Sequence, residues 1–407
     1  MKKSPFFFAA LIAAAAPISL SAATVYWDGN DTVTGAGGTP TGTWGSSLFW
    51  SPDMAGEATT VGWTAGDAAV FSAGTDGIGA WNLNLNGTQV ASSVLVEEGN
   101  ITVGTSGVID TGTGTFTIGT GAGSTARVNI PSTLRLNSAG KVVLDGGTLF
   151  HTNTGNAGSF INAAKGLEIT ANGGSVGYDD SSITNAFTTV YAGTITGTGG
   201  TTGNGGVGTL TKIGPDEFRY QGLGLPNTTY SKLLVLQGLF RLGFASSTQD
   251  ERGFGAVPTV FTPDAIILAG GGSIGTSFTA ANSVLHANRG ITLGDGGGAI
   301  NGSMTVPGAI TGTGTFSHLT TGTVVLTGNS DYSGNTLINL GIVVAGNANA
   351  LGTTSGDTLF SREPSFALTV RRALSRSMNP FRSLAAAAAA AVPSPSKTFP
   401  PRRSPAR

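Results

Sequence analysis

The stretch TGTVVLTGNSDYSGNTLINLGIVVAGNANALG, residues 321–352, contains two short runs in which apolar residues alternate with others. Val324 and Leu326 are the alternating apolar residues of the first run, and Val343 and Ala345 are those of the second. Successive side chains of a β-strand point to opposite faces, so each run predicts a strand with one buried face. The Gly and Asn residues between the runs favour tight turns. The stretch therefore predicts short strands joined by turns.

The same arrangement occurs earlier in the chain and indicates an internal duplication. In residues 217–243, Phe218 and Tyr220 alternate with charged residues. Phe240 and Leu242 follow in a second alternating run. Four matches in one order predict a duplicated unit of about 100 residues rather than a shared bias toward Gly and Thr. The other three matching pairs are 144–166 with 268–290, 167–176 with 291–300, and 193–199 with 308–314.

The composition excludes several classes of protein. The chain has 407 residues, of which 65 are Gly and none is Cys, and 11% of it is charged. The absence of Cys excludes a disulfide scaffold, a thiolate metal site and a Cys nucleophile. Abundant Gly and Thr with few Lys and Glu disfavour long helices and favour short strands. We therefore expect an all-β protein.

Short repeated strands with constant turns predict a solenoid. We expect a right-handed parallel β-helix over residues 91–357, with coils of about 22 residues that each add one strand to two or three parallel sheets. The alternative is a jelly roll or sandwich pair, which requires hairpins with tight turns about every 8 to 12 residues.

The repeat resembles the autotransporter-associated β-strand repeat, also called the passenger-associated transport repeat. The family pattern runs Leu-x-Leu-x-Gly, a Tyr-Ser/Thr-Gly turn and Gly-x-Leu-x-Leu-Gly, and residues 323–352 follow it around Tyr332. The copy that opens at residues 210–214 is more divergent, because additional residues precede Tyr230. The resemblance implies an exported β-helical passenger, displayed on the cell surface or released from it.

The beginning of the chain shows a second likeness to the same group of proteins. Members from Gram-negative bacteria often begin the mature chain with Trp-Asp-Gly, Trp-Ser-x-Asp and Gly-Asp-x-Ala-x-Phe elements. Similar elements occur here at residues 26–29, 49–53 and 66–71. The resemblance thus covers residues 24 to about 352 and corresponds to the passenger portion only. The translocator barrel or anchoring tail of longer members is expected to be absent from this chain.

Residues 1–23 have the features of a signal peptide. Lys2 and Lys3 precede an apolar run from Phe6 to Ile18, and small residues end the segment at Ala23. A run this short is typical of a signal peptide and not of a membrane anchor, so we expect cleavage after Ala23. We expect no transmembrane helix in the mature chain, and a protein that is secreted or held at the outer membrane surface of a Gram-negative bacterium.

Residues 24–90 contain all of the tryptophans. A solenoid needs its first coil covered, because an open apolar end and an unpaired strand edge promote aggregation. We therefore expect residues 24–90 to form an aromatic cap with the first strands. The alternative interpretation is a platform on which the same rings stack against sugars. The tryptophans are Trp27, Trp44, Trp50, Trp63 and Trp81.

Residues 358–407 differ sharply from the rest of the chain. They contain eight Arg, one Lys and a single acid, Glu363, and they contain no Gly. We expect this basic Ala-, Pro- and Arg-rich tail to be disordered. One interpretation is a basic arm for anionic surfaces. The other is a shifted reading frame, because the composition changes in the middle of a repeat.

The sequence offers no convincing catalytic, cofactor-binding or metal-binding residues, and we expect no enzyme activity and no cofactor. His151, His286 and His318 do not occupy equivalent repeat positions, so packed or solvated roles are favoured over that of a triad base. The pairs Glu97-Glu98 and Asp179-Asp180 are adjacent, so on a strand their carboxylates would face opposite ways. Gly-x-Gly strings occur without a following Lys-Ser/Thr, and Asp-rich calcium repeats are not found in tandem.

Three functional hypotheses remain. The first is a structural or adhesive surface protein whose partners are surface glycans, neighbouring cells or other copies of itself; no nucleic acid is expected. The second is a β-helical enzyme that acts on polysaccharides, which rests on analogy of fold. The third is a carbohydrate-binding module that uses the tryptophans.

Overall fold

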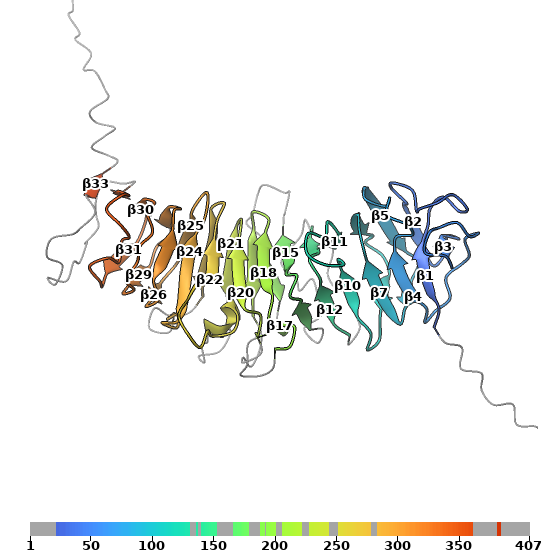
Figure 1. Cartoon of the computed structure of the whole chain (residues 1–407), viewed down its shortest axis with the longest axis horizontal. Helices are drawn as coiled ribbons and strands as arrows, with labels where there is room; N and C mark the ends of the chain where they lie inside the picture. The colour runs from blue at the N-terminus through green and yellow to red at the C-terminus, as the bar shows by residue number, and fades with distance from the viewer. Residues whose placement is uncertain are drawn as a thin grey trace, which may run out of the picture.

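The computed structural model shows an elongated parallel β-solenoid whose coils stack along its long axis from β1 to β31 (Figure 1). It describes these residues: 22–130, 136, 140–152, 166–178, 188–191, 193–200, 206–221, 228–243, 251–277, 283–360 and 381–383. The prediction of a parallel β-helix is confirmed. Among the paired strands of these residues only β1 and β3 run antiparallel, which excludes the jelly roll.

Three long sheets form the sides of the solenoid. The first sheet contains β1 (Thr24–Trp27), β3 (Trp50–Ser51), β4 (Ala68–Phe71), β7 (Ser93–Val96), β10 (Phe116–Ile118), β12 (Val142–Leu144), β14 (Leu167–Ile169) and β17 (Ile195–Gly197). The second contains β2 (Gly42–Trp44), β5 (Ala80–Leu85), β8 (Asn100–Val103), β11 (Arg127–Ile130), β13 (Thr148–His151), β15 (Gly174–Tyr178), β18 (Thr209–Ile213), β20 (Lys232–Val235), β22 (Thr262–Leu268), β24 (Arg289–Leu293) and β27 (Ile310–Gly312).

The third sheet begins in the middle of the chain, and two smaller sheets complete the sides. The third sheet contains β16 (Thr188–Tyr191), β19 (Glu217–Tyr220), β21 (Leu239–Leu242), β23 (Gly272–Thr276), β25 (Gly298–Asn301), β28 (Phe316–His318), β30 (Thr336–Ile338), β32 (Thr358–Phe360) and β33 (Phe381–Ser383). The small sheets contain β26 (Met304–Val306), β29 (Thr323–Leu326) and β31 (Ile342–Ala345), and β6 (Thr88–Val90) and β9 (Val108–Asp110). A 3-10 helix, η1 (Glu251–Phe254), precedes β22.

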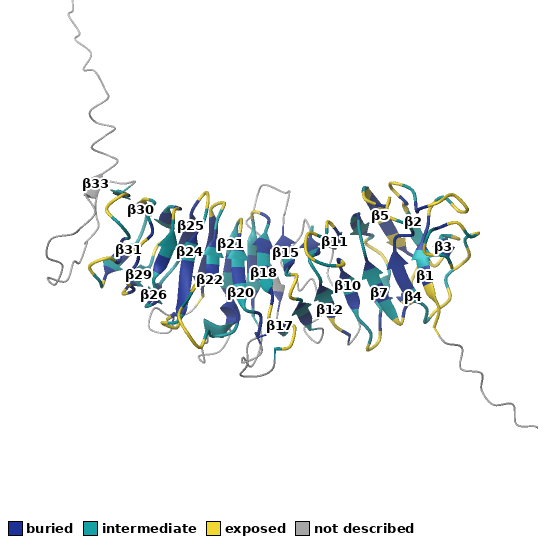
Figure 2. Cartoon of the chain, in the orientation of Figure 1, coloured by how far each residue is buried: buried dark blue, intermediate teal, exposed yellow. Residues whose placement is uncertain are grey.

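The core is a set of columns in which buried side chains of successive coils stack. In the third sheet Phe218 pairs in register with Phe240, and their rings stack with centroids 5.4 Å apart. Strand residues alternate between buried and half-buried along the length of the molecule (Figure 2). The predicted inward residues Tyr220, Val324 and Val343 are all buried, so the alternation was interpreted correctly. Each such apolar side chain contributes about 1.5–3 kcal/mol through burial.

The coils are more variable in length than predicted. Val324 pairs with Val343, which is 19 residues further along, close to the expected value. Val176 pairs with Lys212, which is 36 residues further along. The ladder holds the strands in register, and added length in a connecting segment costs little free energy. The strand pattern therefore predicts the core but not the length of a coil.

The duplicated segments occupy different sides of the solenoid. In the first copy the turn after Leu144 connects the first sheet to the second. In the second copy the matching turn after Leu268 connects the second sheet to the third. The same shift holds for the pairs of strands that follow, β14 and β15 in the first copy and β24 and β25 in the second. The duplicated unit is therefore displaced by one side of the solenoid relative to its first copy.

Parallel strand pairing reaches both ends of the described solenoid. The parallel ladder already begins in the predicted cap, where β1 pairs with β4, so residues 24–90 are the first coils as well as the lid. At the other end β32 extends the ladder to Phe360, and β33 pairs with it. Thr358 is buried like its partner Thr336, so the strand pairing continues past residue 357. The predicted cleavage site at Ala23 precedes β1, and the rest of the predicted signal peptide and tail lies outside the described residues.

Candidate functional site

The tryptophans form one packed cluster at the N-terminal end. Trp27, Trp44 and Trp50 have no exposed surface, and Trp81 is 3% exposed. The ring centroids of Trp27 and Trp50 lie 5.1 Å apart, and those of Trp50 and Trp63 lie 4.7 Å apart. Trp27 Nε1 donates to the carbonyl of Pro40 at 2.7 Å. Four of the rings are buried against one another and Trp63 is half-buried, which favours the cap over a sugar-stacking platform.

Each of the three histidines has different contact partners. His151 is buried on β13, where its ring stacks on Tyr178 with centroids 5.1 Å apart, and burial lowers its pKa to about 4. His318 is buried on β28, with Nδ1 2.9 Å from the carbonyl oxygen of Ile300. The exposed His286 accepts a hydrogen bond at Nδ1 from a backbone amide near the start of β24. These are the contacts of structural side chains.

The adjacent acids Glu97 and Glu98 have different surroundings. Burial, followed by the nearby Glu98 carboxylate, raises the pKa of Glu97. Glu98 Oε1 accepts hydrogen bonds of 2.8 Å from Ser72 Oγ and from the amide of Gly77, so it holds a turn. Asp179-Asp180 lies outside the described residues. In the described part of the chain, no group of three or more His, Cys, Asp and Glu side chains is placed to hold a metal.

Lys212 is a buried cation that the sequence did not single out as functional. Its side chain takes an inward position on β18 and has no exposed surface. Nζ donates to the carbonyls of Ile213, Gly214 and Gln237 at 2.8, 2.7 and 3.1 Å. Burial lowers the pKa of Lys212 to about 7, and the Asp216 carboxylate opposes that shift. The ammonium therefore fastens the turn after β18 to the turn of the next coil.

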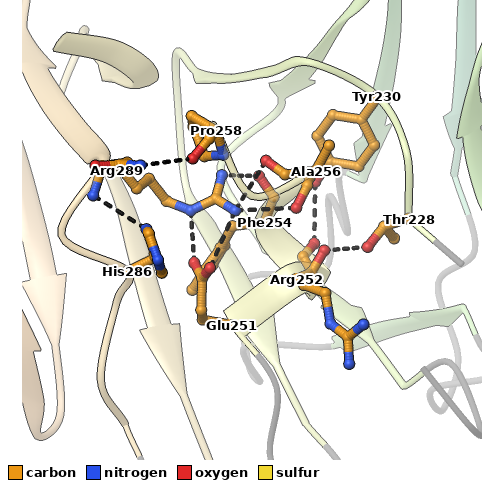
Figure 3. A network of polar contacts seen from close by, with 12 residues as sticks. Thr228, Tyr230, Glu251, Arg252, Phe254, Ala256, Pro258, His286 and Arg289 are labelled. Atoms are coloured by element: carbon orange, nitrogen blue, oxygen red, sulfur yellow. Dashed lines mark hydrogen bonds and ion pairs between the residues drawn. The ribbon is translucent and has the colours of Figure 1, made fainter. Parts of the chain in front are cut away.

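Arg289 is the largest buried charge, and it organises the network in Figure 3. Nε lies 2.5 Å from Oε2 of Glu251, and Nη2 lies 3.3 Å from Oε1. The guanidinium also donates to the carbonyls of Phe254, Gly255 and Ala256 at 3.0 to 3.1 Å. A guanidinium can satisfy this many acceptors because its donors are fixed in one plane. Arg289 thereby holds η1 and the following loop against β24.

Further hydrogen bonds fix the same loop on its other side. Asn288 Nδ2 donates to the carbonyl of Pro258 at 3.0 Å, and Tyr230 Oη donates to the carbonyl of Gly253 at 3.0 Å. Tyr230 is the tyrosine of the divergent repeat copy, and it is completely buried. The repeat tyrosine and the buried arginine thus hold one loop rigidly on the flank of the solenoid.

The loop borders a hollow of about 350 Å³ on the solenoid surface. Val260, in the lining, and its neighbour Phe261 in the sequence are 69% and 46% exposed. Lys232, in the hollow, forms an ion pair with Asp264. The hollow therefore combines apolar surface, hydroxyl groups and a charged pair on a rigid support. Its lining residues are Gly206, Ser231, Lys232, Ala256, Val257, Pro258, Thr259, Val260 and Thr262.

Together the fold and these sites define an extended parallel β-solenoid with a capped N-terminal end. No helix in the described residues has the length and apolar character needed to cross a membrane. The chain is similar to the adhesin BmaC autotransporter of Brucella suis biovar 1 (strain 1330), with 28% identity over 305 residues. The match covers 63% of this chain and 8% of that protein, so the chain corresponds to a small part of its relative. No family model matches the chain, and no solved structure matches it.

Proposed function

We propose that the chain is an exported passenger-type protein with an adhesive or structural role at the surface of a Gram-negative bacterium. The observation that carries the proposal is the parallel strand pairing in overlapping sheets from β1 to β32, together with distant similarity to an autotransporter adhesin. A solenoid of this kind presents long side surfaces, and its nearest-neighbour stacking tolerates loops of variable length. Both properties suit a protein that contacts large partners.

The flank around the hollow is the proposed contact surface. Val260 and Phe261 are exposed there, and the Arg289 network supports the loop that carries them. A rigid loop with exposed apolar side chains loses little entropy on binding. The proposed partners are surface glycans, neighbouring cells or other copies of the chain.

A non-enzymatic role is part of the proposal. The described acids and histidines mostly hold turns or pack in the core, as Glu98 and His151 do. The pectate-lyase-like alternative would require carboxylates or basic residues gathered on one side. An assay for release of reducing sugar from purified polysaccharides tests this part, and release that depends on the chain would overturn it.

Adhesion is tested by coating beads with the purified chain and counting the cells that they retain. We expect retention, and we expect a V260S/F261S double variant to lose at least half of it. The matched control is Ile78→Ser, because Ile78 is 69% exposed but lies near the N-terminal end. Equal retention by coated and uncoated beads contradicts the adhesive role. Retention that the double variant leaves unchanged contradicts only the proposed contact surface.

A further inference from the structure

The cap presents a dense group of exposed apolar side chains at the N-terminal end of the solenoid. The described residues contain 13 exposed large apolar side chains, and four of them lie within residues 33–61. The other nine are spread from residue 78 to residue 342. Apolar side chains gathered on a surface mark sites of interaction. The four are Val33, Leu48, Met54 and Val61, each at least 47% exposed.

Hydrogen bonds join the two segments that carry these side chains. The amide of Gly35 donates to the carbonyl of Ala55 at 2.8 Å. Thr34 Oγ1 donates to Oε1 of Glu57 at 2.9 Å. Figure 2 shows exposed loops beside β2 and β3 at this end of the molecule. We call the exposed side chains of residues 31–37 and 48–61 the end surface.

The strand edges at this end are already occupied. β3 is the outermost strand of the first sheet, and there Trp50 exchanges two backbone hydrogen bonds with Val61, of 2.8 and 3.2 Å. β2 is the outermost strand of the second sheet, and the carbonyl of Thr43 accepts from the amides of Ser46 and Ser47 at 3.2 and 2.9 Å. These bonds compete with the addition of a further strand. We therefore expect a partner at this end to bind through side chains.

The end surface carries negative charge that no base of the N-terminal coils offsets. Residues 24–126 contain nine Asp and Glu and no Lys, Arg or His. Asp31 and Glu57 are exposed, and Asp53 is half-buried. Asp31 Oδ1 accepts from the amide of Thr60 at 2.8 Å, which holds this carboxylate in place. A partner that combines apolar side chains with positive charge is complementary to this surface.

The chain itself contains a segment with these two properties. It continues for 24 residues after β33, from residue 384 to residue 407. This segment has four bases and no acid. Phe399 lies between Lys397 and Arg402 in the sequence, so an apolar ring is flanked by positive charge. The end of the basic tail therefore matches the end surface in charge and in apolar character.

The positions of the two ends favour contact between copies over contact within one chain. β2 and β33 lie at opposite ends of the solenoid (Figure 1). Ten strand spacings separate β2 from β27 and three more separate β28 from β33, which at about 4.8 Å each gives about 62 Å. Phe399 follows Ser383 by 16 residues, so it reaches at most about 55 Å from it. The segment therefore reaches the end surface of another copy more readily than its own.

We propose that the end surface of one copy binds residues 384–407 of a second copy. The apolar residues of the segment cover the exposed apolar side chains, and its bases lie beside the acids. The contact joins two different surfaces, so it repeats from copy to copy and builds rows of solenoids. It uses neither the hollow nor the adhesive role, and it gives a function to the basic tail.

Light scattering of the purified full chain, at a series of protein and salt concentrations, tests the proposal. In dilute salt the average mass should rise above that of one copy as the protein concentration increases. In about 0.5 M NaCl the apparent Kd should be at least about tenfold higher, because salt screens exposed charges. A full chain that stays a single copy at every protein concentration overturns the proposal.

Two variants identify the two surfaces. Removal of residues 384–407 should weaken association by about tenfold or more, and so should D31N/E57Q. The amides of D31N/E57Q keep the oxygen atoms that accept from Thr60 and Thr34. The control D295N/D331N changes two exposed acids outside the end surface and should associate like the wild type. A truncated chain that associates like the full chain overturns the proposal.

A mixture of the two variants tests the head-to-tail arrangement. The truncated chain keeps its end surface and D31N/E57Q keeps its tail, so the mixture should form pairs but no longer rows. If D31N/E57Q fails to fold, a labelled peptide of residues 384–407 replaces it, and the truncated chain should raise the fluorescence anisotropy of the peptide. A mixture that stays as single copies, or a peptide that the truncated chain does not bind, contradicts the proposed contact.

Discussion

Arg289 binds Glu251 across a separation of 38 residues, with Nε 2.5 Å from Oε2. Arg289 is completely buried, whereas the Glu251 side chain is 13% exposed. The pair joins β24, which carries Arg289, to η1, which carries Glu251 (Figure 3). Because the carbonyls of the loop after η1 also accept from Arg289, the ion pair and the loop form one unit.

The first prediction concerns removal of this buried arginine. Arg289→Met should lower the free energy of unfolding by about 3–5 kcal/mol, because it leaves a nearly buried carboxylate and three carbonyls without their donor. Arg241→Met is the matched control, because Arg241 binds Glu217 at 2.9 Å with 26% of its side chain exposed. The control should cost about 1 kcal/mol or less. Denaturant unfolding of both variants gives the comparison, and equal losses would count against a structural role for the network.

The second prediction is a pH dependence that originates at Lys212. Burial lowers its folded pKa to about 7 from 10.5, so between these values the unfolded chain binds more protons than the folded chain. The contribution of Lys212 to stability therefore becomes more favourable as the pH rises through this range. The free energy of unfolding of Lys212→Met should exceed that of the wild type most at pH 7 and below. This difference between the two proteins should shrink toward pH 10.

Unfolding curves at a series of pH values measure this difference. Lys141→Met is the control for net charge, since Lys141 is 60% exposed and pairs with Glu168 at the surface. A difference between the wild type and Lys212→Met that stays constant from pH 7 to pH 10 would show that Lys212 does not change protonation on folding.

The third prediction concerns the N-terminal cap. Trp50 is completely buried between Trp27, Trp44 and Trp63, and its Nε1 has no hydrogen-bond partner. Trp50→Ala should cost about 3–5 kcal/mol through the cavity that it leaves. Trp50→Phe should cost less, because it keeps an aromatic ring and loses no hydrogen bond. Thermal unfolding compares the two, and a Trp50→Ala protein with the Tm of the wild type would mean that the cluster is not the lid of the first coil.

The alternation of side chains predicted much of the fold but not the buried charges. Phe218 and Tyr220 were assigned to the core because the strand period alone places them there. The same period also places Lys212 inward, two residues after Leu210, and that was the available signal for a buried lysine. Arg289 and Gly290 end the second duplicated segment, just as Lys165 and Gly166 end the first. Glu251, the partner of Arg289, could not be inferred, because the contact depends on the path of a loop.

The proposed fold and function both depend on the stacking of coils. Engineered disulfides test this stacking most directly. In the first sheet Thr117 pairs with Val143, and Val143 pairs in turn with Glu168. Adjacent strands lie about 4.8 Å apart, within reach of a disulfide, whereas strands two apart are separated by about 9.6 Å. Because the natural chain has no Cys, each pair of introduced cysteines reports on one contact.

The measurement is the fraction of cross-linked chain after mild oxidation of the folded protein. The parallel solenoid predicts nearly complete cross-linking for T117C/V143C and almost none for T117C/E168C. Cross-linking of both pairs to the same extent, or of neither pair, would contradict the stacking of one coil directly on the next.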